Sequence, residues 1–340
     1  MKISSRLTRA IAGIVAGVVL TWLLLASTGN PSEAVSRIGA SLSRCDLMLV
    51  LAAFGLFTAS QVLRAFRWKL LSFRHRVPFT LSMPVTSIHV GLGHLLPVRL
   101  SDVAFVGLFR KFGDIPVGDG TATVILAKLQ DILAMGIVIG TVFVAGVSGK
   151  IILLAPALVL AGLLGVVLLP RILVILNRPV HRLFSGRFSR VSLWFDDLKE
   201  ASVVRGRRGL FLTALGLSIV AWTCKLLMFT FLLRAIGITD IPIWKVFFAS
   251  GVTDLTMALP VHGLLSLGTV EAGWATGFAI VGIEGIVGPG FSILEAGFSV
   301  HILWLSMAVI LMLPAVPWLL LSHRRGKRSG NCPDNGKVNV

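Results

Sequence analysis

The stretch GHLLPVRLSDVAFVGLFRKFG at residues 93–113 places polar groups inside a sequence that is otherwise apolar enough to enter a bilayer. Pro97, Arg99 and Asp102 fall within six residues of one another. Proline interrupts helical hydrogen bonding, and a charge at membrane depth costs about 2.5–3.5 kcal/mol on insertion scales. The stretch therefore predicts a broken helix that lines a polar site.

The composition around this stretch is that of an integral membrane protein. Of 340 residues, 55% are hydrophobic and only 14% are charged, which is too few charges for the surface of a soluble domain of this size. About 17–25 apolar residues cross a bilayer. Apolar runs of about this length occur at 10–26, 47–63, 132–149, 151–169, 209–224 and 296–321. We expect the first run to be an uncleaved helix, because no small-residue cleavage site follows it.

The net charge of +17 is interpreted as cytoplasmic basic residues, because such residues collect on the inner face of membrane proteins. No soluble basic domain accompanies it, so we expect no nucleic-acid partner. The cysteines Cys45, Cys224 and Cys332 are too scattered for a disulfide framework or a metal site. We therefore expect no metal and no cofactor.

Basic clusters predict the topology. They lie at 2–9, 64–76, 171–208 and 322–328, and we place all four on the cytoplasmic side of the inner membrane, with both termini. An even number of crossings must then separate each pair of clusters. Segments 10–63 and 121–169 each supply two crossings. Segment 78–111 must then enter and leave on one side or stay at the interface, and we predict a re-entrant hairpin broken near Pro97. Further spans are predicted near 209–234, 244–260, 262–283 and 295–320.

These assignments give an all-α integral membrane protein of about eight transmembrane helices. Residues 1–321 form one polytopic domain, and 322–340 form a disordered basic tail in the cytoplasm. Within the domain, 171–208 mixes apolar side chains with arginines and is interpreted as a cytoplasmic interfacial segment, with an ordinary basic loop as the alternative. Three residues near the end of the second span are assigned to the membrane interface: Arg64, Arg67 and Trp68.

A weak internal repeat divides the chain into two halves. The sequence HLLPVRL at 94–100 is echoed by MALPVHG at 257–263, and each copy is followed by an acidic residue. Pro97, Pro260 and Gly268 are predicted to break the helices. Paired broken segments are expected where a transporter site lies between repeats.

The candidate binding residues are ionisable groups within or beside apolar runs. They are Arg99, Asp102, Lys128, Asp131, Lys225, Asp254 and Glu271. Arginine suits a phosphate because its planar fork donates two parallel hydrogen bonds. Three cations against four carboxylates leave three alternatives open: a phosphate head group, a zwitterionic head group, or a proton relay through a carboxylate.

Two further alternatives remain for these residues. Lys128 and Asp131 lie three apart on one helix and could form an internal ion pair, as could Arg99 and Asp102. Histidines in or beside the apolar runs are interpreted as hydrogen-bonded side chains, because their spacing does not suit a metal site. Nucleotide-binding and hydrolase motifs do not occur, so no catalytic residue is assigned.

The order and spacing of four motifs resemble those of a known family. The motifs are SQVLRAFRWKLL (60–71), LLPVRLSD (95–102), AKLQD (127–131) and LPVHGLLSLGTVE (259–271). Together they are similar to the lysylphosphatidylglycerol synthase transmembrane-region family, also called flippase-like membrane proteins. The resemblance implies a multi-span protein with re-entrant elements that moves lipids between leaflets.

The chain also departs from the family pattern. The family usually has Asn near position 94, Gly at 101 and Glu-Arg at 127–128, where this chain has His94, Ser101, Ala127 and Lys128. The Pro-Gly-Gly of the last motif is missing. We expect a stand-alone member without the soluble synthase domain of the aminoacyl-lipid branch. The scaffold is carried over by the resemblance, while the substrate is not.

We therefore predict a lipid translocase that moves a polar-headed lipid, such as a phospholipid, a polyprenyl-linked lipid or a hopanoid lipid, across the membrane. A gradient or mass action would drive it. Membrane lipids and enzymes of lipid biosynthesis are the expected partners. The alternatives are an integral-membrane glycosyl- or head-group transferase and a non-catalytic subunit of a lipid pathway.

Overall fold

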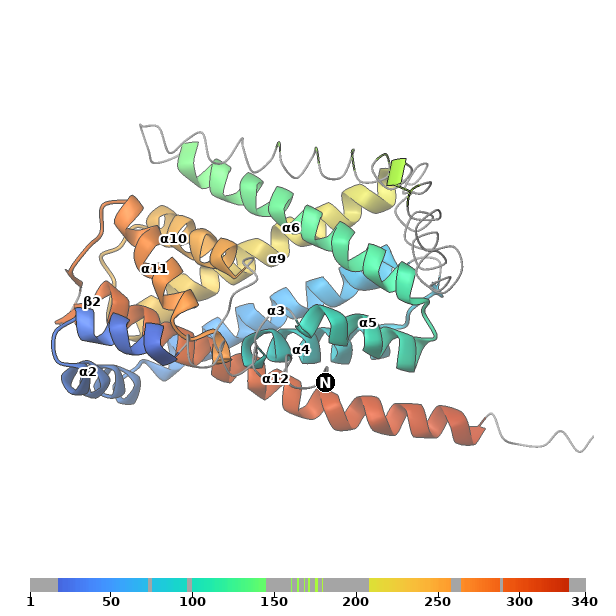
Figure 1. Cartoon of the computed structure of the whole chain (residues 1–340), viewed down its shortest axis with the longest axis horizontal. Coiled ribbons are helices and arrows are strands. Elements are labelled where there is room, and N and C mark those ends of the chain that lie inside the picture. Colours follow the sequence, from blue (N-terminus) through green and yellow to red (C-terminus); the bar gives the residue numbers. More distant parts are fainter. Residues whose placement is uncertain are drawn as a thin grey trace, which may run out of the picture.

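The part of the chain that the structure describes is a bundle of α-helices with a small β-hairpin (Figure 1). This computed structural model describes residues 18–72, 75–96, 100–144, 208–257, 264–287 and 290–329, with a few isolated positions between 160 and 179. Most of the predicted interfacial segment 171–208 and part of the predicted tail, 330–340, lie outside the described residues.

Four helices of the described chain are long and apolar enough to cross a membrane. They are α3 (Leu47–Leu71), α6 (Val117–Val144), α9 (Arg208–Ala235) and α12 (Ile293–Ser329). A shorter apolar helix covers Val18–Ser27. The chain is therefore an all-α, multi-pass membrane protein.

Two pairs of short helices lie between the long ones. They are α4 (Phe79–Leu95) with α5 (Leu100–Gly113), and α10 (Ile243–Thr256) with α11 (Thr269–Ile280). With 12 to 17 residues each, they extend for roughly 18–26 Å, less than the ~30 Å of bilayer hydrocarbon. The spans predicted near 244–260 and 262–283 thus correspond to helices too short for a crossing.

The order of elements repeats along the chain. A long helix, two short helices and a long helix occur in α3–α6, and the same order recurs in α9–α12. The two Leu-Pro-Val motifs fall at the junctions between the short helices, at 96–98 and 259–261. The prolines themselves, Pro97 and Pro260, lie outside the described residues.

Local signals in the sequence fix where several helices begin. Asp46 caps α3 by accepting hydrogen bonds from the backbone N–H groups of Met48 and Leu49. Helix α2 (Pro31–Ser43) begins with a proline directly after the N-cap Asn30. This first helical position suits proline, because the N–H that proline lacks would have no partner within the helix.

The start of α11 depends on a glycine. Gly268 has φ of 82°, a left-handed conformation that costs glycine little, and the helix begins at the next residue. The turn η3 (Leu264–Ser266) precedes it. After α11, strands β1 (Ile286–Val287) and β2 (Phe291–Ser292) form the hairpin that leads into α12.

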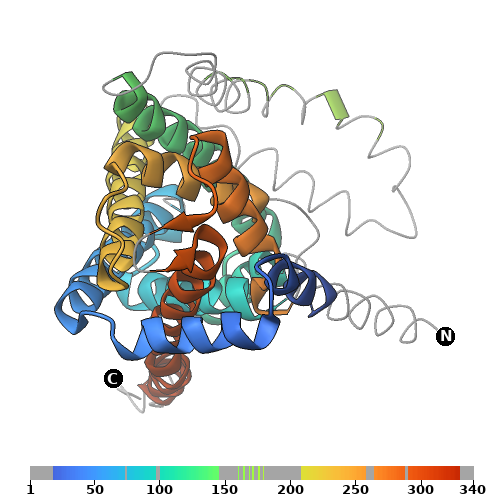
Figure 2. The same ribbon diagram turned by 90° about the vertical axis from the view of Figure 1, so that its left-hand side faces the viewer.

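The long helices cross the molecule while the short pairs fill the spaces between them. Helix α3 packs along α9, and α6 also packs on α9 (Figure 1). Helix α4 packs on α5 and α12, and α10 packs on α11. The end-on view shows α2 lying across one end of the bundle (Figure 2). Large apolar side chains such as Leu51, Leu212 and Leu313 are exposed, as expected for a lipid-facing surface.

The C-terminal helix is longer than predicted. Helix α12 continues to Ser329, so residues 322–329, which the sequence assigned to a disordered tail, are helical. Pro314 and Pro317 lie within this helix.

The close approach of α10 and α11 generates a first prediction. A Cβ added at Gly277 would lie 2.6 Å from the Cα of Ala249, so this contact excludes a side chain. We expect Gly277→Val to lower the free energy of unfolding by about 1–3 kcal/mol through overpacking. Reversible unfolding in mixed detergent micelles measures this change.

Gly216→Ala on α9 is the matched control, because no atom lies within 4 Å of its added Cβ. It should keep or slightly raise stability, since alanine is the better helix former. Equal stability of Gly277→Val and the parent protein would contradict the close packing of α10 on α11.

Candidate functional site

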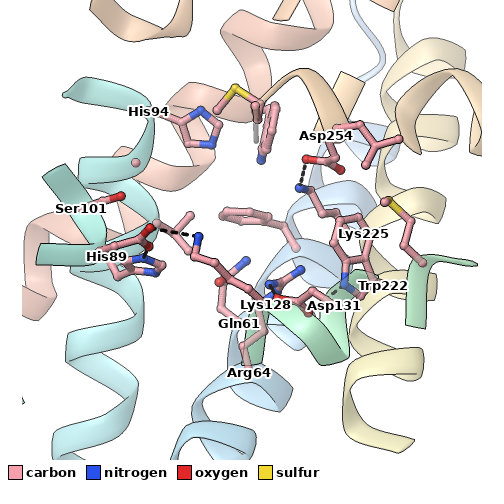
Figure 3. A pocket seen from close by; sticks show the side chains of 18 of the residues that line it. Gln61, Arg64, His89, His94, Ser101, Lys128, Asp131, Trp222, Lys225 and Asp254 are labelled. Carbon is pink, nitrogen blue, oxygen red and sulfur yellow. Dashed lines mark hydrogen bonds and ion pairs between the residues drawn. The ribbon is translucent and has the colours of Figure 1, made fainter. Parts of the chain in front are cut away.

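A cavity of about 390 Å³ lies between the helices of the two halves (Figure 3). Helices α3, α4, α5 and α6 of the first half and α9, α10 and α12 of the second contribute to its wall. Its polar lining consists of Gln61, Arg64, His89, His94, Ser101, Asp102, Lys128, Asp131, Lys225 and Asp254. The aromatic side chains of Trp222 and Trp304 also form part of the cavity wall. Ionisable groups from distant parts of the sequence thus meet in one place.

Asp131 of α6 is the most heavily contacted carboxylate of the cavity. Arg67 of α3 donates to both of its oxygens, at 2.5 Å and 3.2 Å, and the indole N–H of Trp222 on α9 donates at 2.8 Å. Arg67 also donates to the hydroxyl of Ser218 at 2.9 Å. Its side chain is only 1% exposed. The bidentate Arg67–Asp131 contact joins α3 to α6, and the Trp222 contact joins α9 to the same carboxylate. Asp131 therefore fixes the three helices relative to one another.

Arg64 lies one turn before Arg67 and faces the same carboxylate. Its Nη1 lies 3.5 Å from Oδ2 of Asp131, and its guanidinium carbon lies 5.3 Å from the ring centroid of Trp222. The two arginines share one carboxylate, so this part of the cavity carries one excess positive charge. Arg64 is the less tightly bonded of the two and lines the cavity.

A second ion pair joins α5 to α6. Asp102 accepts from Lys128 at 3.0 Å on one oxygen, and a ring nitrogen of His89 on α4 lies 3.0 Å from the other. The Lys128 side chain is 42% exposed, which makes it the most accessible cation of the cavity. The contact corrects one alternative, because Lys128 pairs with Asp102 rather than with Asp131 on its own helix.

A third ion pair joins α9 to α10. The ammonium group of Lys225 lies 2.5 Å from Oδ1 of Asp254. It also lies 5.1 Å from the ring centroid of Trp222 and 4.7 Å from that of Trp304. Aromatic faces stabilise a desolvated cation, so this lysine is held by both kinds of contact. Among the described residues, Oδ2 of Asp254 has no hydrogen-bond partner.

The described charges of this cluster do not cancel. Four cationic side chains, Arg67 included, meet three carboxylates, which leaves one positive charge when the histidines are neutral. The count differs from the sequence-based count because Arg64 and Arg67 join the cluster. In addition, Glu271 is not on the cavity wall, and Arg99 lies outside the described residues.

The structure brings five of the seven predicted binding residues together on the cavity wall. Asp102, Lys128, Asp131, Lys225 and Asp254 line the cavity. Nothing in the described chain places Arg99.

Glu271 takes a different position from the cavity residues. It is fully buried at the start of α11, where one oxygen accepts from the N–H of Gly268 at 2.7 Å and the other lies 2.6 Å from Nδ1 of His301. A carboxylate in the first turn compensates free backbone N–H groups and the helix dipole, which is the role Glu271 has here.

Three residues assigned to the membrane interface lie elsewhere. Arg67 and Trp68 are buried within the bundle, and Arg64 lines the cavity. Arg67 is drawn inward by Asp131, and Trp68 packs on Phe105 with ring centroids 4.4 Å apart. Their burial argues against side chains that reach lipid head groups. The assignment rested on a basic cluster and on a tryptophan near the end of the second span, and neither signal reports which way a side chain points.

Sequence reasoning missed six polar or aromatic residues of the cavity wall, and it assigned a seventh, Arg64, to the membrane interface. The six are Gln61, His89, His94, Ser101, Trp222 and Trp304. A usable signal existed for the histidines, which lie near Asp102 and Arg99 in an apolar run. The tryptophans carried none, because apolar spans contain such residues for packing alone. Among the described residues, no group of three or more His, Cys, Asp or Glu side chains is placed to hold a metal ion.

A comparison with protein families identifies the family to which the chain belongs. The model of the family described as lysylphosphatidylglycerol synthase TM region matches residues 10–309. The chain belongs to this family. The match confirms the resemblance of the four motifs, and it places the protein among membrane proteins of lipid metabolism or transport. Comparisons with curated proteins and with solved structures found no match.

The buried Arg67–Asp131 pair generates a second prediction. We expect Arg67→Ala to lower the free energy of unfolding by about 3–5 kcal/mol, because it leaves a carboxylate that is only 18% exposed without its main partner. Unfolding in mixed micelles measures the loss. Arg110→Ala removes an exposed arginine of α5 and should change stability by less than about 0.5 kcal/mol. Similar losses in the two variants would show that the buried pair has no special structural role.

Proposed function

We propose that this protein is a lipid translocase whose cavity holds the polar head group while the acyl or prenyl tails stay in the bilayer. The observation that carries the proposal is the cluster of ion pairs, drawn from both halves of the chain, around a cavity among membrane helices. In transporters, charged side chains at membrane depth line the substrate pathway, and the binding site commonly lies at the interface between internal repeats. Membership of a lipid-associated family supports the same conclusion.

The charge of the cavity favours a phosphate in the head group. Arg64 is the second guanidinium on Asp131 and is free to bind an anion with its planar fork. The accessible ammonium of Lys128 can approach the same anion as a point charge. One excess positive charge matches one phosphodiester group, as in phospholipids and polyprenyl-linked lipids.

The size of the cavity fits a head group better than a whole lipid. Sites for small molecules usually measure about 300–1,000 Å³, and 390 Å³ lies at the lower end of this range. Two long tails would not fit inside, so they would remain between the outer surfaces of the helices and the surrounding lipid. Hopanoid lipids fit the cavity only in forms that carry a polar head.

In this proposal, the two short helix pairs are re-entrant elements that enter the membrane and return. Their lengths, below that of a crossing, and their repeated place in each half support this arrangement. Broken helices direct free backbone N–H groups toward an anion at the point of interruption. The protein would lie in the inner membrane with both termini in the cytoplasm, as the basic clusters predict.

One experiment separates the translocase from two rivals. A head-group or glycosyl transferase would make a new lipid only when a donor is present, and a partner subunit would neither move nor change lipid. The test is to reconstitute the full chain in vesicles with acyl-labelled phosphatidylglycerol and no donor. Label reaching the inner leaflet supports translocation, whereas no movement rejects it.

Arg64 generates the third prediction. We expect Arg64→Gln to slow translocation of labelled phosphatidylglycerol by about 10–100-fold, since charged hydrogen bonds contribute about 1.5–3 kcal/mol. Arg64→Lys should fall between this variant and the parent, because it keeps the charge and loses the fork. The measurement is the rate at which label becomes protected from an impermeant reductant.

Arg234→Gln, at the exposed end of α9, is the matched control and should translocate at the parent rate. Intact folding is checked by gel filtration of each variant. A parent-like rate for Arg64→Gln would reject Arg64 as the group that binds phosphate.

A further inference from the structure

A second buried polar group adjoins the cavity where α4, α11 and α12 meet. It consists of His94, His301, Glu271 and Trp304, and the cavity ion pairs do not include it. His94 and Trp304 also line the cavity, while Glu271 and His301 lie behind it. The group therefore leads from the cavity into the protein interior.

The inner end of the group is a carboxyl–imidazole pair. Oε1 of Glu271 lies 2.6 Å from Nδ1 of His301, and both side chains are almost completely buried, at 0% and 1% exposure. A pair this close can pass a proton directly from one partner to the other. The second carboxylate oxygen accepts from the N–H of Gly268, at the start of α11.

The middle of the group holds three ring nitrogens without a hydrogen-bond partner among the described residues. They are Nδ1 of His94, Nε2 of His301 and Nε1 of Trp304. The imidazole centroids of His94 and His301 lie 6.1 Å apart, and the Trp304 ring lies 4.2 Å from the centroid of His94. Buried polar atoms are nearly always bonded to protein or water, and a water needs two to four such partners.

The charges around this group come from four neighbouring elements. Lys225 of α9 lies across the cavity from His94 and contacts the Trp304 ring (Figure 3). Asp254 of α10 is paired with that lysine. Arg37 of α2 is bonded to Glu295, further toward the start of α12. Among the described residues, Glu271 is therefore the carboxyl group in contact with His301.

We propose that His94, a bound water, His301 and Glu271 form a proton relay that couples proton movement to lipid translocation. This inference rests on the proposed translocase function and names its coupling ion. His94 takes a proton from the cavity on one ring nitrogen and releases the proton of the other to the water. The water protonates Nε2 of His301, and the Nδ1 proton then passes to Oε1 of Glu271. The carboxylate becomes a carboxylic acid, and no electron is transferred.

The relay ends at Glu271, a carboxylate that also accepts a hydrogen bond at the start of α11. Protonated Glu271 is a weaker acceptor for the N–H of Gly268, because a charged acceptor bonds more strongly than a neutral one. Gly268 has the left-handed conformation on which the start of α11 depends. Protonation therefore loosens the junction between η3 and α11, next to the second Leu-Pro-Val motif, and biases the short helix pair toward another position.

The test, which supplies the fourth prediction, is the distribution of a labelled lipid across a pH gradient. Vesicles of phosphatidylcholine containing the full chain and a trace of acyl-labelled phosphatidylglycerol are given a gradient of one pH unit, and an impermeant reductant reports the outer-leaflet fraction. Coupling of one proton to one lipid allows up to roughly a tenfold excess in one leaflet, since one pH unit corresponds to a factor of ten. We expect a clear excess for the parent protein and an equal distribution for His301→Gln.

Two further variants sharpen the comparison. In Glu271→Gln the amide oxygen can accept from the N–H of Gly268, and the amide N–H can donate to Nδ1 of His301 in its other tautomer. The amide cannot take the relayed proton, so this variant should also give an equal distribution. His75→Gln breaks another histidine–carboxylate pair, with Asp119, away from the cavity, and it should keep the parent's excess.

The outcomes separate the relay from the translocase. An equal distribution of moved label in the parent protein, with or without the gradient, would overturn the relay and leave translocation standing. An excess retained by both relay variants would overturn the assignment of these residues. Label that never leaves the outer leaflet in the parent would overturn the translocase and the relay together.

Discussion

A charged side chain inside a membrane protein needs a partner, and here the partners come from different helices. Asp131 of α6 binds Arg67 of α3 and Trp222 of α9, so one carboxylate ties three long helices together. The ion pair of Lys128 with Asp102 fixes α5 against α6. The contacts that satisfy these charges also set the positions of the helices, and the cavity is the space they enclose.

The same pairing explains why the cavity can bind a ligand. Complete neutralisation would leave a polar interior with no preference for an anion. The second guanidinium on Asp131, that of Arg64, prevents complete neutralisation. It is placed over the Trp222 ring, at the wall of the cavity. A fixed, partly desolvated guanidinium attracts a phosphate more strongly than one in water, because the local dielectric is lower.

The sequence predicted the class of fold and five residues of the site because a charge in an apolar run is conspicuous on energetic grounds. It did not predict the partners. Lys128 has Asp131 on its own helix three residues away, and only the packing of α5 on α6 brings Asp102 closer. Arg67 was misplaced since net charge along a sequence does not report which arginine turns inward. The spacing of Gly268 and Glu271 is typical of a helix start followed by an acid in the first turn, so it did predict a capping role for Glu271. The sequence analysis interpreted Glu271 as a binding residue instead.

The most direct test of the account is an electron cryo-microscopy map of the full chain in nanodiscs of phosphatidylglycerol and phosphatidylethanolamine. The central claim is that the interhelical ion pairs enclose a site for a lipid head group. We expect phosphate density inside the cavity, within hydrogen-bonding distance of the Arg64 guanidinium, with tail density leading out between the helices. Acyl-chain density filling the cavity, with head groups found only at the bilayer surfaces, would contradict the claim.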